Sequence, residues 1–226
     1  MTLDDFGGGP ARVYNSPGSQ QLVHALPTAS NLKPLVLASQ SQIRRQLLTN
    51  AGLTFHTDAA DIDERAVAAS IPGPSREIAT GLAVAKALHV AARHPGALVI
   101  GADQMLELDG HNLSKAADAA AGRAALMRLR GRTHHLHSGV ALAHGDQVLW
   151  SHVDSAAMHV RDFSDGWLDA YLAACPESLT TSVGAYQLEG PGVQLFERIE
   201  GDYFTILGLP LLPLLAALRE HGVLPS

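Results

Sequence analysis

The stretch Leu35-Val-Leu-Ala-Ser-Gln-Ser-Gln-Ile-Arg-Arg-Gln-Leu-Leu48 decides the fold of this chain. Its apolar start predicts a short buried strand, and a serine-containing turn leads from it into a helix with two arginines. The free N–H groups and the positive dipole end of a helix N-terminus attract anions. Ser39 and Ser41 add hydroxyl donors, while Arg44 and Arg45 add planar cations suited to phosphate oxygens. The stretch therefore predicts a phosphate-binding turn, with a capped surface helix and solvated arginines as the alternative.

Composition limits the classes of protein to which the chain can belong. It has 226 residues, of which 46% are hydrophobic and 17% charged, enough to bury the core of one large or two small domains. The formal net charge of −6 argues against stable nucleic-acid binding, which normally needs a basic face. No apolar run reaches the length of a membrane span, so we expect no membrane partner. The single cysteine, Cys175, excludes an internal disulfide and fits a reducing cytoplasm.

The beginning of the chain differs in composition from the rest. Residues 1–33 start with an acidic segment and contain glycines and prolines, without the basic start and apolar centre of a signal peptide. We expect these residues to form a flexible N-terminal extension that takes no part in the chemistry. Residues 34–226 are then expected to form one domain.

The order of the predicted elements indicates the fold class. Strand and helix patterns alternate at first, and β-hairpins dominate the middle, with a tight turn at Asp109-Gly110. Apolar and alternating runs predict strands near 98–103, 133–143, 147–160 and 183–188, and helices near 75–93, 119–130 and 213–221. We expect an α/β protein with a mixed sheet, whose ligand binds at the carboxyl ends of strands.

Asp103 is the strongest candidate for a catalytic side chain. It follows the small and apolar run Leu98-Val-Ile-Gly-Ala102, so it is expected where a buried strand ends. An ionised carboxylate at such an edge can hold a divalent metal or orient a water molecule. The alternative is an ordinary turn or helix-cap aspartate, although no helix pattern starts there.

Several other charged residues stay ambiguous when they are taken singly. Lys86 lies on an otherwise alanine-rich helix and is a candidate for an inward-pointing cation. Lys115 follows the predicted hairpin and could reach a phosphate, but it could equally be a surface lysine. The acids Asp61, Asp63 and Glu64 could supply a metal ligand or form a solvated loop.

Histidine and cysteine chemistry offers two weaker alternatives. His135 and His137 share one face of a predicted strand and could bind Zn²⁺, but no second ligand cluster lies at a suitable spacing. Cys175 precedes Pro176 without an activating pattern, which favours a buried thiol over a nucleophile.

Taken together, the motifs resemble those of the Maf family of nucleoside triphosphate pyrophosphatases. The resemblance covers the chain from about residue 35 to 223 and lies in the order and spacing of seven short motifs. These are Leu37-Ala-Ser-Gln-Ser-Gln-Ile-Arg-Arg-Gln-Leu-Leu48, Asp61-Ile-Asp-Glu64, Ala83-Val-Ala-Lys-Ala87, Val99-Ile-Gly-Ala-Asp-Gln104, Leu129-Arg-Gly-Arg-Thr133, Gly184-Ala-Tyr-Gln-Leu-Glu-Gly190 and Phe196-Glu-Arg-Ile-Glu-Gly-Asp-Tyr203.

The resemblance implies an elongated α/β fold, with a mixed sheet flanked by helices and a central nucleotide cleft like that of ITPases. It further implies a homodimer that splits a nucleoside triphosphate into the monophosphate and pyrophosphate with Mg²⁺ or Mn²⁺. Asp103 matches the catalytic aspartate of the family, and together with Glu64 it matches the acids that could hold the metal. The positions that match the groups around the triphosphate are Ser39, Ser41, Arg44, Lys86 and Lys115.

Base choice in the family is linked with three positions, which here are Ile43, Gln104 and Glu189. The pair Gln104 and Glu189 resembles the branch associated with 7-methyl-GTP, although Ile43 replaces the aromatic residue expected there. A carboxylate at Glu189 could accept from guanine N1–H and N2–H and would favour a positively charged, N7-methylated ring. The alternatives are a dTTP, UTP or CTP pyrophosphatase, or a non-catalytic nucleotide-binding or septum-regulating protein. The last is favoured by Ser114 and Ala116, which flank Lys115 where the family commonly has glycine and proline.

Overall fold

The computed structural model describes residues 33–225 of the chain. The predicted extension therefore lies, apart from its last residue, outside the described residues. None of the helices in residues 33–225 combines the length and apolar composition that a membrane span requires.

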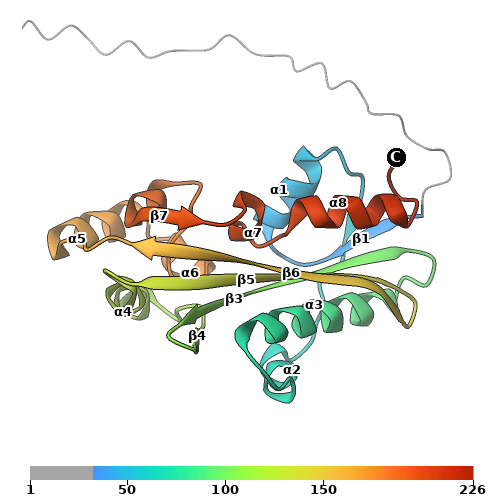
Figure 1. Ribbon diagram of the computed structural model, residues 1–226, viewed down its shortest axis with the longest axis horizontal. Coiled ribbons are helices and arrows are strands. Elements are labelled where there is room, and N and C mark those ends of the chain that lie inside the picture. Colours follow the sequence, from blue (N-terminus) through green and yellow to red (C-terminus); the bar gives the residue numbers. More distant parts are fainter. Residues whose placement is uncertain (1–32, 226) are drawn as a thin grey trace, which may run out of the picture.

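Seven strands form a single sheet, and helices cover it on both sides (Figure 1). The strands are β1 (Leu35–Ala38), β2 (His56–Thr57), β3 (Leu98–Leu108), β4 (His111–Leu113), β5 (Thr133–His144), β6 (Gln147–Val160) and β7 (Phe196–Glu200). The helices are α1 (Gln42–Asn50), α2 (Glu64–Ser70), α3 (Ser75–Ala91), α4 (Ala119–Leu129), α5 (Asp165–Ala174), α6 (Ser178–Thr181), α7 (Tyr203–Ile206) and α8 (Leu211–Glu220), with a 3₁₀ helix at Pro191–Leu195.

The sheet is mixed, as the sequence predicts. Its strand order is β2-β1-β3-β5-β6-β7, with β4 paired to the far part of β3. Strand β1 runs parallel to β2 and β3, whereas all other pairs are antiparallel. The predicted hairpin turns at Asp109 and Gly110, whose φ values of 51° and 76° suit the primed turns that join antiparallel strands.

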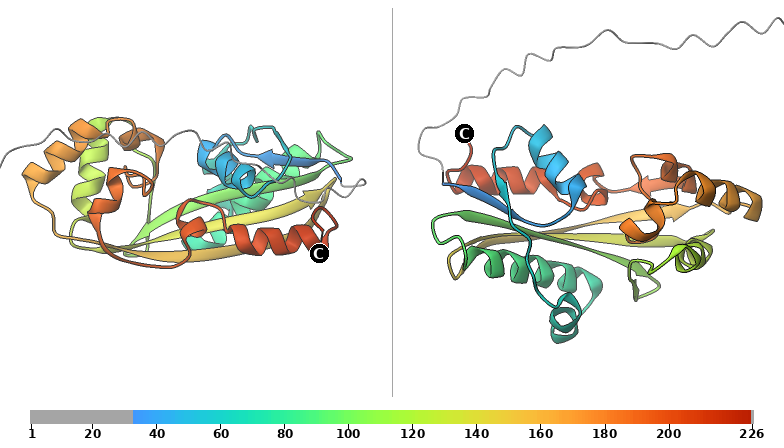
Figure 2. Two further views of the ribbon diagram at one scale, coloured as in Figure 1. Left: turned by 90° about the horizontal axis from the view of Figure 1, so that it is seen from above. Right: turned by 180° about the vertical axis from the view of Figure 1, so that it is seen from behind.

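Long strands give the molecule its elongated shape, which the family resemblance implies. Strands β3, β5 and β6 run along most of the length, with α1, α3 and α8 at one end and α4, α5 and α6 at the other (Figure 1). Seen from above and from behind, the two groups of helices remain separate along the sheet (Figure 2). We call the first group, together with β1, the first lobe, and the second group, together with β7, the second lobe.

Side chains along each strand alternate between the two faces of the sheet, so the first lobe has one core on each face. Leu98 and Ile100 of β3 pack into the core shared with α1 and α8, whereas Val99 packs on the opposite face against α3. A separate core fills the second lobe around Phe163, Met158 and Leu168. The same alternation turns Asp103 toward the α3 face and Gln104 toward the α1 face.

Two glycines bring α3 unusually close to the sheet. A Cβ atom at Gly101 would lie 2.0 Å from the carbonyl oxygen of Ala83, and one at Gly139 would lie 2.4 Å from that of Ala79. Only glycine allows such an approach, because any side chain would collide with helix backbone, which cannot swing aside. The short separation lets polar side chains of α3 reach the strands.

The structure corrects three expectations about local structure. Residues 183–188, predicted as a strand, form turns and irregular chain that follow α6. The acidic segment after β2 begins helix α2, because Asp63 accepts from the N–H groups of Arg65 and Ala66 as an N-cap. The last helix begins at Leu211, with Pro213 in its first turn, where a proline removes no intrahelical hydrogen bond.

We predict that Gly101→Ala destabilises the protein by about 2 kcal/mol or more, because the added methyl group collides with the backbone of α3. Gly96→Ala is the matched control, since a Cβ atom there meets nothing within 4 Å. Urea unfolding should show the loss for Gly101→Ala and a change within about 0.5 kcal/mol for Gly96→Ala. Equal stability of the two variants would contradict the close packing of α3 on the sheet.

Candidate active site

A lysine held between two carboxylates forms the centre of the site. The Lys86 Nζ atom lies 2.6 Å from Asp103 Oδ1 and 2.7 Å from Glu64 Oε1. The side chains of Lys86 and Asp103 are each only 10% exposed, whereas that of Glu64 is 55% exposed. A buried ammonium of this kind needs a carboxylate partner, because desolvating an unpaired charge is costly. We call Glu64, Lys86 and Asp103 the charge cluster.

The position of Asp103 corrects the expectation that it ends a strand. Strand β3 continues to Leu108, so Asp103 lies in its middle. The edge of β3 beside Asp103 is left open because β1 stops at Ala38. Ala38 pairs with Gly101, two residues before Asp103. Asp103 is therefore next to the end of a parallel strand, although the strand that ends is β1.

Glu64 reaches the charge cluster because of its place in α2. The neighbouring Asp63 caps this helix, with its Oδ1 atom 3.1 Å from Arg65 N and 3.0 Å from Ala66 N. Capping fixes the first turn and turns Glu64 toward Lys86. Of the three acids that the sequence left open, Glu64 joins the site, Asp63 supports the helix, and Asp61 is exposed.

Arg44 is a buried clamp between three segments of the first lobe. Its Nε atom donates to Gly208 O at 2.8 Å, and its Nη1 atom donates to Ala102 O at 2.8 Å and to Ser39 Oγ at 3.3 Å. Burial lowers the pKa of Arg44, and the negative charges of Asp103 and Glu64 oppose this shift. Arg44 is thus tied electrostatically to the charge cluster.

The remaining residues of the predicted turn divide between structure and solvent. Arg45 is exposed, as the alternative of solvated arginines expects, whereas Arg44 is not. Ser41 caps α1 by accepting from Arg44 N at 3.4 Å, and Ser39 Oγ accepts from Ser41 N at 3.2 Å. Because both hydroxyl oxygens act as acceptors here, their hydrogens remain able to donate to an anion.

Gln104 is anchored on the opposite face of β3. Its Nε2 atom lies 3.0 Å from Ser138 Oγ, 3.2 Å from Thr205 O and 3.0 Å from Ile206 O. Ser138 is fully buried and donates its hydroxyl to Thr205 O at 2.7 Å. The sequence motifs do not include Ser138, whose only signal is a serine among the small and apolar residues of β5.

Three predicted residues have no place in these networks. Lys115 follows β4 and Glu189 lies in a turn of the second lobe; both are exposed, and neither makes a hydrogen bond or ion pair within residues 33–225. Ile43 packs, partly buried, against the core between α1 and α8. The roles of Lys115 and Glu189 remain predictions from the family resemblance.

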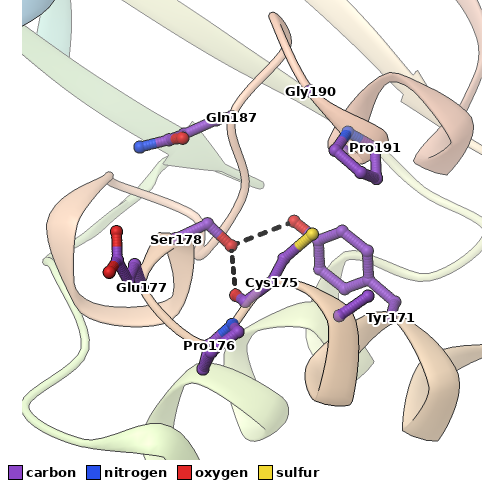
Figure 3. A pocket seen from close by; sticks show the side chains of 10 residues that line it. Tyr171, Cys175, Pro176, Glu177, Ser178, Gln187, Gly190 and Pro191 are labelled. Carbon is purple, nitrogen blue, oxygen red and sulfur yellow. Dashed lines mark hydrogen bonds between the residues drawn. The ribbon is translucent and has the colours of Figure 1, made fainter.

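A cavity of about 320 Å³ lies in the second lobe, away from the charge cluster. Figure 3 shows Ser178 hydrogen-bonded to the Tyr171 hydroxyl and to the backbone carbonyl of Cys175 on one side, with Gln187 and Pro191 on the other. Burial raises the pKa of Tyr171. Cys175 is half-buried here and shows no activating partner among the described residues.

The histidine alternative finds no support in the described part of the chain. His137 Nδ1 bonds Ser155 Oγ at 2.8 Å, and its Nε2 atom lies 3.5 Å from Glu107 Oε2. His134 is buried against Tyr186, and burial lowers its pKa to about 3. Within residues 33–225, no three His, Cys, Asp or Glu side chains gather as a metal-binding group.

The charge cluster nevertheless suits a metal ion whose remaining ligands come from the substrate. Asp103 and Glu64 converge on one point, and each offers Lys86 only one of its two carboxylate oxygens. Mg²⁺ commonly uses one or two carboxylates, with water and substrate phosphates supplying its other ligands. These donors therefore fit Mg²⁺ or Mn²⁺ better than a metal ion whose ligands all come from the protein.

The fold and site together define an α/β protein with a mixed, elongated sheet and a lysine-balanced acidic site at the end of its parallel strand. The family model described as "Maf-like protein" matches residues 34–221. The chain therefore belongs to the Maf-like family, and the predicted family and fold are confirmed.

Named relatives are similar over nearly their whole length. A "Nucleoside triphosphate pyrophosphatase" of Maricaulis maris is 52% identical over 190 residues, covering 84% of this chain and 97% of the relative. A "7-methyl-GTP pyrophosphatase" of Rhizobium meliloti is also 52% identical, over 86% of this chain and 100% of the relative. Among solved structures, the Ham1 protein of Staphylococcus aureus matches with a TM-score of 0.43 and 19% identity, over 84% of this chain and 99% of that one.

We predict that Arg44→Ala and Arg45→Ala differ strongly although the residues are neighbours. Removing Arg44 leaves two buried carbonyl oxygens without their donor, which should lower the free energy of unfolding by about 3 kcal/mol. Removing the exposed Arg45 should change it by less than about 0.5 kcal/mol. Urea unfolding of both variants tests this, and equal losses would contradict the clamp that we assign to Arg44.

Proposed function

We propose that the protein hydrolyses a nucleoside triphosphate between its α- and β-phosphates and that 7-methyl-GTP is its preferred substrate. The products are the nucleoside monophosphate and pyrophosphate. The class of enzyme, a hydrolase acting on acid anhydrides, follows from the family. The observation that carries the proposal is Lys86 between Asp103 and Glu64, at 2.6 and 2.7 Å.

Lys86 and Arg44 each keep donors for a triphosphate. An ammonium group has three N–H bonds, and Lys86 directs two of them at Asp103 and Glu64. A guanidinium has five, of which Arg44 uses three within the described structure, so that its Nη2 group remains. Both cations can therefore bind phosphate oxygens without giving up the contacts that hold them, and they would stabilise the charge that develops there.

Asp103 is positioned to handle the attacking water. Its Oδ1 atom accepts from Lys86, which leaves Oδ2 to accept a hydrogen bond from water and orient or deprotonate it. The Lys86 ammonium, 2.6 Å away, holds the carboxylate in a fixed orientation. The water oxygen forms a bond to the α-phosphorus as the water proton passes to the carboxylate. The bond between the α-phosphorus and the bridging oxygen breaks, and its electron pair leaves with pyrophosphate.

A divalent cation would be held by Asp103 and Glu64. When it is bound, it neutralises charge on the triphosphate. Lys86 then has a second function, because it balances the two acids whenever the cation is absent. This arrangement places a positive charge between the buried carboxylate of Asp103 and the half-exposed carboxylate of Glu64.

The preference for 7-methyl-GTP rests on Gln104 and Glu189 and on similarity. Relatives named "7-methyl-GTP pyrophosphatase" come from Rhizobium meliloti and Brucella abortus, the latter 50% identical over 190 residues. A carboxylate at Glu189 can accept from both guanine N1–H and N2–H and attracts the cationic ring of an N7-methylated base. Thymine and uracil offer only one such donor and no charge.

A non-catalytic nucleotide-binding protein is the second candidate. It is favoured by Ser114 and Ala116, which flank Lys115 where the family commonly has glycine and proline. Tight nucleotide binding without turnover would decide for it.

We predict that Asp103→Asn lowers kcat by at least about 100-fold, because an amide cannot accept the water proton. Asp61→Asn is the matched control, since Asp61 is an exposed aspartate that makes no contact with the charge cluster in the described structure. ³¹P NMR of reactions with Mg²⁺ should show monophosphate and pyrophosphate for the wild type and for Asp61→Asn. Release of orthophosphate, or full activity of Asp103→Asn, would contradict the mechanism.

We predict that Glu189→Gln reduces the preference, measured by kcat/KM, for 7-methyl-GTP over the pyrimidine nucleotides. The variant loses the carboxylate that favours a cationic ring, so the ratio of kcat/KM for 7-methyl-GTP over UTP should fall by about 10-fold or more. A panel of 7-methyl-GTP, dTTP, UTP and CTP measures this ratio for both proteins. A wild type that prefers dTTP or UTP would overturn the base assignment while leaving the chemistry intact.

A further inference from the structure

Ser138 and the carbonyl groups of α7 decide which end of the Gln104 amide faces outward. The Gln104 Nε2 atom lies 3.0–3.2 Å from three oxygens, two of which are the backbone carbonyls of Thr205 and Ile206. Carbonyl oxygens accept hydrogen bonds and never donate them. The atom that faces them must therefore be the amide nitrogen.

Ser138 completes the arrangement from β5, directly opposite Gln104 in the register. Its hydroxyl has one hydrogen, which it donates to Thr205 O at 2.7 Å. Toward Gln104 the same hydroxyl can only accept. Because Ser138 is fully buried, water cannot replace either of these hydrogen bonds.

The other end of the amide remains available. Gln104 Oε1 makes no hydrogen bond in the described structure, and Gln104 is only partly buried. A Cβ atom at Gly208 would lie 3.6 Å from this oxygen and 3.4 Å from Arg44 Nη2. Gln104 Oε1 and Arg44 Nη2 thus both lie close to Gly208, and the oxygen presents a hydrogen-bond acceptor there.

We propose that Ser138 is a positioning residue for base selection: it fixes Gln104 as an acceptor, so that the site favours a base with an N–H group there over one with a carbonyl oxygen. The inference rests on the proposed function for its substrate and deepens it. Guanine C2 carries an amino group with two hydrogens, so that one can be donated to Glu189 and the other to Gln104 Oε1, whereas C2 of uracil carries a carbonyl oxygen. A carbonyl opposite Oε1 would bring two acceptors together, which desolvates both without a hydrogen bond.

The test compares Ser138→Ala with Ser178→Ala in the full-length protein. Both remove a buried serine hydroxyl that donates to a backbone carbonyl, but Ser178 lies in the second lobe. In Ser138→Ala the ratio of kcat/KM for 7-methyl-GTP over UTP should fall by about 3- to 10-fold, the cost of one lost hydrogen bond. The fall in this ratio should come mainly from a higher KM for 7-methyl-GTP. The ratio for Ser178→Ala should match that of the wild type. An unchanged ratio in Ser138→Ala, or equal changes in both variants, would overturn the proposal.

Side-chain NMR provides a readout that does not depend on turnover. In ¹⁵N-labelled wild type, the Gln104 amide protons should be protected from solvent exchange, and this protection should drop in Ser138→Ala but not in Ser178→Ala. Unchanged protection in Ser138→Ala would overturn the role of Ser138 even if the protein hydrolysed no nucleotide. Absence of hydrolysis with the expected NMR change would contradict the proposed function alone.

Discussion

The site depends on one buried ammonium group that is shared by two acids. Lys86 can reach Asp103 only because α3 lies almost against the sheet, at distances that Gly101 and Gly139 alone permit. Glu64 then joins from the capped start of α2. Without the lysine, the buried carboxylate of Asp103 would face that of Glu64 with no positive charge between them, which is electrostatically unfavourable. The packing of one helix on a sheet thus brings the compensating charge into the site.

Arg44 and Gln104 extend this arrangement to the opposite face of the same strand. Arg44 connects the start of α1 to Ala102 of β3 and to Gly208, while Gln104 is held by β5 and α7. Both use part of their hydrogen-bonding capacity to join segments far apart in sequence and keep part of it free. Side chains that are anchored in this way are preorganised, so that binding a ligand costs little conformational entropy. Rigid placement of donors and acceptors is what selective recognition of a nucleotide would require.

Sequence patterns predicted the mixed sheet and its hairpin at Asp109-Gly110, because these follow from local periodicity and turn chemistry, and they left Lys86 as a candidate for an inward-pointing cation, which is buried. They misplaced the end of the strand at Asp103, since the end that matters belongs to β1 and depends on pairing between distant segments. They also could not choose among Asp61, Asp63 and Glu64, because which acid caps a helix and which meets a lysine is decided by tertiary packing. Ser138 was missed for the same reason.

In the proposed mechanism, the charge cluster holds the bond to be cleaved. A crystal structure with Mg²⁺ and the non-hydrolysable analogue of 7-methyl-GTP that carries a methylene group between the α- and β-phosphorus atoms tests it most directly. We predict that the α- and β-phosphates lie within hydrogen-bonding distance of Lys86 Nζ and Arg44 Nη2, with the cation on Asp103 and Glu64. A nucleotide bound instead in the cavity beside Tyr171 and Ser178, with Lys86 still closed between its two acids, would contradict it.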